Sequence, residues 1–218
     1  MDIEIFTFLT NVVITLEGIA ALVSILYYKK VINTPLKFFP LILIYIFVNE
    51  FSAEYTYRYF GTNVPQYNVY NIIFFLFFYY VFWSYVKNAK HKQWIKIGAI
   101  IFILSCFVNV LFQSFVREPQ LLTYVLGACL LIFCIILYYI EILTTSKILL
   151  INQDFLFWIS VGLLLFYVGY IPIKLTRHFF VTQQDLFPTL RLVHYILIII
   201  MNGFFIFGFL WTTRRSRV

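Results

Sequence analysis

The chain has 218 residues, of which 63% are hydrophobic and 11% are charged, with a formal net charge of +7. Soluble domains are about 45–50% apolar and about 25% charged, so this composition excludes a water-soluble fold. The three cysteines lie inside apolar runs without a CxxC pair, which excludes the common zinc and redox motifs. The composition predicts an integral membrane protein whose main partners are membrane lipids.

A membrane-spanning helix needs about 20 mostly apolar residues. The apolar segments predict an all-α, polytopic bundle of seven transmembrane helices that forms a single domain over residues 1–218. The expected helices cover residues 5–28, 36–58, 67–87, 94–116, 120–143, 155–175 and 188–212. The first is expected to remain in the protein, because Met1-Asp2-Ile3-Glu4 lacks the basic segment of a signal peptide.

Turn and cap signatures separate several of these helices. They are Asn33-Thr34-Pro35, Gly61-Thr62-Asn63-Val64-Pro65, Glu118-Pro119 and Asn152-Gln153-Asp154. Proline and glycine interrupt helices, and Asn, Thr and Asp cap them. We therefore expect helix ends at these four places.

The basic residues are unevenly divided between the two sides of this bundle. The first, third and fifth loops and the C-terminal tail hold eleven Lys and Arg, and the opposite side holds five. Because cytoplasmic loops carry the excess of Lys and Arg, the N-terminus is expected outside and the C-terminus in the cytoplasm. This distribution accounts for the net charge, so we expect no nucleic-acid partner.

Glu17 is the clearest of the polar groups that are costly in lipid. It lies about 12 residues into the first helix, about 18 Å deep and near the bilayer centre. Ionisable groups at this depth are candidates for function. Glu17 is expected to face the bundle interior, either as a proton-binding or ligand-binding carboxylate or as a structural, hydrogen-bonded carboxyl. Gly18 and Ala20-Ala21 beside it predict close approach of another helix.

Other polar side chains share the depth range between the outer surface and the midplane. Together with Glu17 they predict a ligand-binding cavity open to the outside, enclosed by helices one, two, three, six and seven. The further candidates are Asn49, Glu50, Asn71, Tyr167, Tyr170 and His194, with Asn202 near the middle of the last helix. Helices four and five are expected to contribute little beyond Asn109 and Glu141.

Two charged pairings are open to test within this pattern. Glu54 and Arg58 are spaced i, i+4 on one helix, which favours a weak surface pair. Lys174 either extends to the outer membrane interface or turns inward to pair with Glu50.

Catalytic motifs are missing from the sequence. It has no HExxH, GxSxG, Walker or CxxC motif. We therefore expect no catalytic residues, no metal site and no cofactor.

Three sequence segments carry a family resemblance. The run Phe157-Trp158-Ile159-Ser160-Val161-Gly162-Leu163-Leu164-Leu165-Phe166-Tyr167-Val168-Gly169 resembles one in a group of small, uncharacterised bacterial seven-helix membrane proteins. Tyr27-Tyr28-Lys29-Lys30 with Asn33-Thr34-Pro35-Leu36-Lys37, and Gln113-Ser114-Phe115 followed by Tyr124-Val125-Leu126-Gly127, are similar to the same group. The resemblance implies a multi-pass protein of the bacterial inner membrane and carries no established activity.

The favoured hypothesis is a non-enzymatic membrane sensor or signalling subunit. It would bind a small or lipid-like ligand in the outward cavity and act on a cytoplasmic signalling partner or within a membrane protein complex. The alternative is a small transporter or channel in which Glu17 is the proton or cation site. A third option is a lipid-modifying enzyme that uses Glu17, Glu50 and His194 as acid–base groups.

Overall fold

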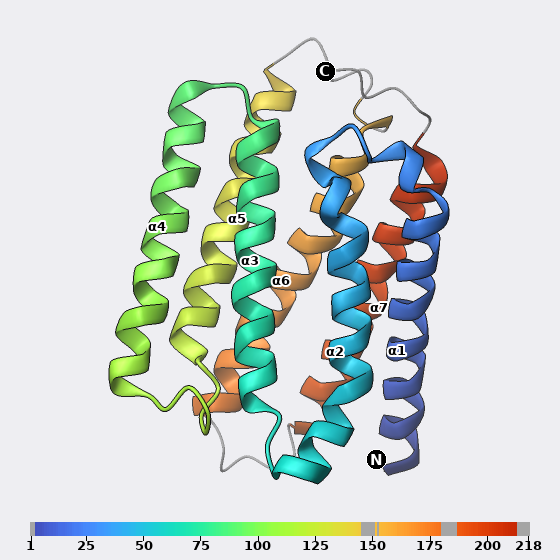
Figure 1. The fold of residues 1–218 in the computed structure, drawn as a ribbon, viewed down its shortest axis with the longest axis vertical. Coiled ribbons are helices and arrows are strands. Elements are labelled where there is room, and N and C mark those ends of the chain that lie inside the picture. Colours follow the sequence, from blue (N-terminus) through green and yellow to red (C-terminus); the bar gives the residue numbers. More distant parts are fainter. Residues whose placement is uncertain (1–2, 145–150, 152, 180–186, 213–218) are drawn as a thin grey trace. The chain divides into compact units, whose positions relative to one another are not determined.

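The computed structural model describes residues 3–144, 151, 153–179 and 187–212. Within these ranges all regular elements are helical and none is a strand, so the all-α, seven-helix prediction is confirmed. The long helices in Figure 1 are α1 (Ile3–Leu26), α2 (Phe39–Phe60), α3 (Val64–Tyr85), α4 (Ala89–Phe112), α5 (Leu121–Leu143), α6 (Phe155–Phe179) and α7 (Phe187–Trp211). Two short 3₁₀ helices, η1 (Tyr28–Lys30) and η2 (Pro35–Phe38), connect α1 to α2.

Six of the seven helices are long and apolar enough to cross a membrane, which makes the chain a multi-pass membrane protein. The remaining helix, α3, has 22 residues and no charged residue. Its tyrosine and asparagine side chains are what lower its hydropathy. That α3 also crosses the membrane stays a prediction.

Three of the expected helix ends are produced by the predicted local signals. Thr34 accepts a hydrogen bond from Leu36 N at the start of η2, with Pro35 in the first turn. Gly61 has a φ of 72°, a left-handed conformation that favours glycine, and Pro65 lies in the first turn of α3. Asp154 accepts a hydrogen bond from Leu156 N at the start of α6.

The start of α4 differs from the expectation, since the helix begins at Ala89 rather than near residue 94. The Asn88 side chain accepts hydrogen bonds from the first free backbone amides of the helix. The Glu141 carboxylate of α5 accepts two more, from the backbone amides of Lys87 and, at 3.1 Å, Asn88. A carboxylate is favourable at a helix N-terminus because it opposes the helix dipole.

The chain divides into two compact units, each described here by itself. Unit 1 comprises residues 1–47 and 150–218, and unit 2 comprises residues 48–149, so α2 contributes to both. A compact unit need not fold alone, and the single-domain expectation stays a prediction. Met1, Asp2 and Asn152 lie outside the described residues, as do four of the eleven basic residues counted on the cytoplasmic side: Lys147, Arg214, Arg215 and Arg217.

In unit 1, α7 packs against both α1 and α6. Phe39 at the start of α2 is fully buried, with its ring 5.3 Å from that of Phe205 and 5.9 Å from that of Phe209. These aromatic contacts join the end of α7 to the first residue of α2. Aromatic pairs at such distances are worth about 0.5–1.5 kcal/mol beyond the area they bury.

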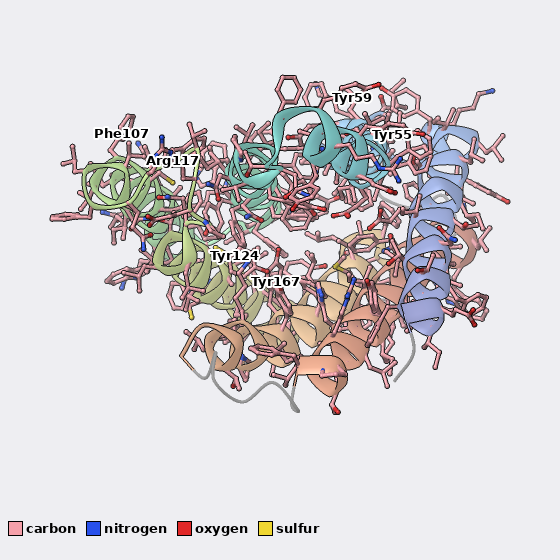
Figure 2. The ribbon with its side chains drawn as sticks, turned by 90° about the horizontal axis from the view of Figure 1, so that it is seen from below. Tyr55, Tyr59, Phe107, Arg117, Tyr124 and Tyr167 are labelled. Carbon is pink, nitrogen blue, oxygen red and sulfur yellow. The ribbon has the colours of Figure 1, made fainter. Side chains whose placement is uncertain are left out.

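In unit 2, α3, α4 and α5 pack against one another side by side (Figure 1). The fully buried rings of Phe75 and Phe102 meet edge to face at 5.4 Å. The Tyr79 hydroxyl donates to the Gly127 carbonyl at 2.7 Å, which satisfies both groups inside the bundle. Phe107 lies on the outer side of α4 and is 71% exposed, as expected for a side chain facing lipid (Figure 2).

Candidate functional site

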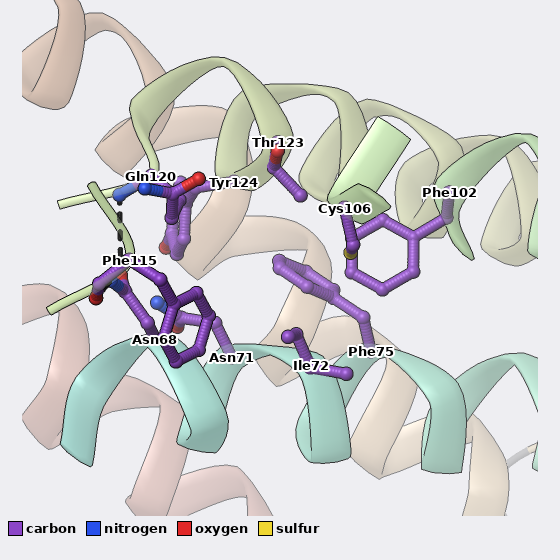
Figure 3. Close-up of a pocket in the computed structure, with 10 residues that line it drawn as sticks. All are labelled: Asn68, Asn71, Ile72, Phe75, Phe102, Cys106, Phe115, Gln120, Thr123 and Tyr124. Carbon is purple, nitrogen blue, oxygen red and sulfur yellow. Dashed lines mark hydrogen bonds between the residues drawn. The ribbon is translucent and has the colours of Figure 1, made fainter. Parts of the chain in front are cut away.

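A pocket lies inside unit 2, between α3, α4, α5 and the loop that joins α4 to α5 (Figure 3). Its cavity volume is about 20 Å³, which is room for about one water molecule. A ligand larger than water would therefore have to move the lining side chains apart. The lining residues are Asn68, Asn71, Ile72, Phe75, Phe102, Cys106, Phe115, Gln120, Thr123 and Tyr124.

Asn68 holds the α4–α5 loop against α3 at the edge of this pocket. Its side-chain amide donates to the carbonyls of Phe115 at 2.8 Å and Glu118 at 3.1 Å. Its side-chain oxygen accepts from the backbone amide of Gln120 at 3.2 Å, the bond drawn in Figure 3. Asn68 is buried and fully used, so its role is to position the loop.

Gln120 is also tied into this edge of the pocket. Its side-chain oxygen accepts from Asn109, and its amide donates to the Glu118 carbonyl at 3.3 Å. Asn71 differs, because no hydrogen bond to its side chain is found among the described residues. Asn71 is therefore the polar lining group that can offer its amide to a ligand.

The two parts of the lining have different chemistry. Asn71, Gln120 and Thr123 supply polar groups, whereas Phe75 and Phe102 supply an apolar wall. Charged side chains are absent from the described lining. Small-molecule sites usually combine an apolar wall with a few polar groups, and the lining of this pocket has that composition.

A second polar cluster joins α2 to α3 within unit 2. The Tyr67 hydroxyl donates to the Glu50 carboxylate at 2.9 Å. The Gln66 side-chain amide donates to the Asn49 carbonyl at 2.6 Å and to the Ser52 hydroxyl at 2.9 Å. Asn49 and Glu50, both sequence candidates, therefore do lie together in one polar cluster.

Glu17 is buried in unit 1, with 4% of its surface exposed, as expected for a carboxyl that faces inward. The neighbouring Ala20 and Ala21 are buried too. A Cβ placed on Gly18 would lie 3.1 Å from the Phe47 ring, so a side chain of α2 packs against this glycine. The close approach of a whole helix at the small-residue patch stays a prediction. The identity of the hydrogen-bonding partner of Glu17 stays a prediction.

The remaining unit 1 candidates lie on α6 and α7. The rings of Tyr170 and His194 stack at 4.1 Å, and Tyr167 is buried nearby on α6. Asn202 donates to the Ile198 carbonyl of its own helix at 3.1 Å, which uses one of its two amide hydrogens. Lys174 lies 5.7 Å from the Tyr170 ring; whether it also pairs with Glu50 stays a prediction, since the two residues belong to different units.

The predicted cavity would draw residues from both units. Unit 1 holds five of the candidates, and unit 2 holds Asn49, Glu50 and Asn71. A single outward cavity that joins the two sets therefore stays a prediction. The predicted surface pair of Glu54 and Arg58 is confirmed and is exposed.

The sequence analysis predicted no pocket on helices four and five, and its expectation for their part in the outward cavity stays a prediction. Both helices line the unit 2 pocket, through residues such as Cys106 on α4 and Thr123 on α5. The sequence reasoning weighted ionisable groups, whereas this pocket is built from aromatic and neutral polar side chains. Gln120, next to the Glu118-Pro119 turn, is the signal that could have revealed it.

The chemistry of the described residues does not point to a metal centre. They hold no group of three or more His, Cys, Asp and Glu side chains placed to bind a metal ion. No family model, curated protein or solved structure matches the chain. The resemblance to a bacterial seven-helix group thus stays a prediction, and the geometry has to carry the functional argument.

Proposed function

We propose that the chain is a non-enzymatic membrane sensor or signalling subunit, with the unit 2 pocket as its ligand site. The observation that carries this proposal is the amphipathic lining, in which the Asn71 amide lies beside the Phe75 and Phe102 wall. A neutral, lipid-like molecule with one polar end matches it. A charged head group would find no opposite charge in the described lining to offset its loss of hydration.

Unit 2 also contains a route from this pocket to the opposite ends of its helices. The pocket lies where α5 begins, and Glu141 near the end of α5 holds the turn before α4. His91 is 3.8 Å from the same carboxylate. A ligand that shifts α5 would disturb this contact beside Lys87 and Lys90, where a cytoplasmic partner with acidic groups would bind.

The ligand proposal is tested by photo-crosslinking in lipid nanodiscs with a diazirine-bearing fatty alcohol. The alcohol should label the pocket peptides of α3 and α4, and Asn71→Leu should reduce this labelling about five-fold, because one lost hydrogen bond of about 1 kcal/mol changes affinity by that factor. Asn11→Leu, the same change at an exposed position of α1, is the control and should leave labelling unaltered.

Two results would contradict this function. Labelling that ignores Asn71, or that favours the matching fatty acid over the alcohol, would refute a neutral-ligand pocket. A proton or cation flux in proteoliposomes that Glu17→Gln abolishes would replace the sensor by the transporter. The burial of Glu17 is the observation that favours this second function.

We also propose an orientation with the N-terminus outside and the C-terminus in the cytoplasm, in the bacterial inner membrane; the excess of Lys and Arg in the first, third and fifth loops and the tail supports the orientation. Reporter fusions after Lys30, Lys92, Lys147 and Val218 should all report the cytoplasm. Lys87, Lys90 and Lys92 would then lie beside anionic cytoplasmic lipids. A periplasmic signal from the fusion after Val218 would overturn the orientation.

A further inference from the structure

The polar cluster between α2 and α3 contains two buried groups that lack hydrogen-bond partners among the described residues. They are the side-chain oxygen of Gln66, an acceptor, and the side-chain nitrogen of Asn49, a donor. Asn49 is 97% buried, since only 3% of its surface is exposed. Both residues belong to unit 2, and the Gln66 amide donates to the backbone carbonyl of Asn49, so the Gln66 side chain lies against α2 at Asn49.

The orientation of the Gln66 amide is determined by its contacts. Its nitrogen lies 2.6 Å from the Asn49 carbonyl, which can only accept a hydrogen bond. Reversing the amide would place two acceptors against each other. The Gln66 oxygen is therefore the group left over, and it is held in place by the two hydrogen bonds that its own nitrogen donates.

Burying these two polar groups without hydrogen bonds would cost folding free energy. Asn49 lies in α2, within a segment long and apolar enough to span a membrane. Lipid tails offer no hydrogen-bond partner to a polar group in such a segment. A buried polar group without a partner destabilises the folded state, and here there are two. Buried polar groups that a protein retains in this way generally hold an ordered water or a ligand.

The chemistry of the two groups selects the class of occupant. A hydroxyl both donates and accepts, so one hydroxyl donates to the Gln66 oxygen and accepts from the Asn49 amide. A metal cation would suit the Gln66 oxygen but would meet the positive end of the Asn49 N–H dipole. An apolar chain would leave both groups unpaired.

We propose that the Asn49–Gln66 pair is a binding site for a hydroxyl group, supplied by a buried water molecule or by a hydroxyl-bearing lipid head group. Tyr67 and Glu50, the next residues in the sequence after Gln66 and Asn49, form a hydrogen bond of their own between the same two helices. The hydroxyl site is separate from the lining of the pocket proposed above and does not depend on the function of that pocket. It ties the two helices of the α2–α3 hairpin through the bound group.

The test is the sign of the stability change in Asn49→Leu, measured by thermal unfolding in phosphatidylcholine nanodiscs with and without monogalactosyldiacylglycerol. If a hydroxyl is bound, the leucine removes its donor and the melting temperature falls by about 2–4 °C. If the melting temperature falls in nanodiscs made of phosphatidylcholine without the galactolipid, water is the source, because this lipid has no hydroxyl. A fall only with the galactolipid identifies the head group. Asn11→Leu is the matched control and should leave the melting temperature unchanged in both membranes.

An unchanged or raised melting temperature for Asn49→Leu in both membranes would overturn the proposal, because removing an unsatisfied amide is neutral or stabilising. If the variant does not fold, the unaltered protein supplies a second readout. NMR magnetisation transfer should connect the Asn49 side-chain amide to a water or galactosyl hydroxyl proton. Its absence in both membranes would equally refute the site.

Discussion

Gly127→Val is expected to destabilise unit 2 by about 3 kcal/mol and to abolish ligand labelling in its pocket. A Cβ at this position would lie 2.7 Å from the Phe102 ring and 2.8 Å from the Phe75 ring, distances that side chains do not tolerate. Both rings are fully buried and packed edge to face, so neither can turn away without disturbing the other. Overpacking of a dense core usually costs about 1–3 kcal/mol, and valine adds two more methyl groups.

The same substitution also threatens a buried hydrogen bond and the pocket. The Gly127 carbonyl accepts from the Tyr79 hydroxyl, and a displaced helix would lengthen that bond. Because Phe75 and Phe102 also form the apolar wall of the pocket, the space into which they can move is the ligand site itself. Labelling by the fatty alcohol should therefore fall even in molecules that remain folded.

Gly203→Val is the matched control, because nothing lies within 4 Å of a Cβ at Gly203. Both variants carry the same cost of a β-branched residue in a helix, so the difference between them isolates the packing. Thermal unfolding and crosslinking measure the two effects. Equal stability of the two variants would show that the α3–α4–α5 packing is looser than described, and Phe102→Leu should partly rescue Gly127→Val if the clash is real.

Lys30→Met is expected to destabilise unit 1 by about 1.5–3 kcal/mol, the range for hydrogen bonds to a charged group. The Lys30 ammonium donates to the carbonyls of Phe209 at 2.6 Å and Thr212 at 2.7 Å, at the C-terminal end of α7. These carbonyls have no partner within the helix, and a cation there also opposes the helix dipole. Without the lysine, the end of α7 loses its connection to the segment after α1.

Lys29→Met removes the same charge from the adjacent, exposed position and should cost little. Thermal unfolding of the two variants separates capping from the general effect of a basic loop. If Lys29→Met is as harmful as Lys30→Met, the loop charge matters and the cap does not.

The pH dependence of this pair is a further part of the same prediction. Burial lowers the pKa of Lys30 below its ordinary value of 10.5. Between the lowered pKa and 10.5 the unfolded chain binds more protons than the folded chain, so the contribution of Lys30 to stability rises with pH in that window. The gap between the original protein and Lys30→Met should therefore widen as the pH approaches 10.5.

The sequence by itself determined the features that depend on length, composition and nearby residues. Apolar runs predicted seven helices, and Gly61 and Pro65 marked the turn between α2 and α3. The Glu54–Arg58 pair followed from spacing on one helix. The burial of Glu17 followed from the cost of a carboxyl in lipid, which any fold of this chain has to meet.

Only the tertiary structure decided which distant groups meet. Glu141 accepts a hydrogen bond from the backbone amide of Asn88, 53 positions earlier in the chain, at the start of α4. Lys30 donates to the carbonyl of Phe209, 179 positions later, at the end of α7. The pocket needed three helices to be placed side by side, because its lining is mostly apolar. In a membrane protein the lipid-facing and core-facing sides of a helix are both apolar, so periodicity does not reveal which side packs inward; the contacts between helices decide it.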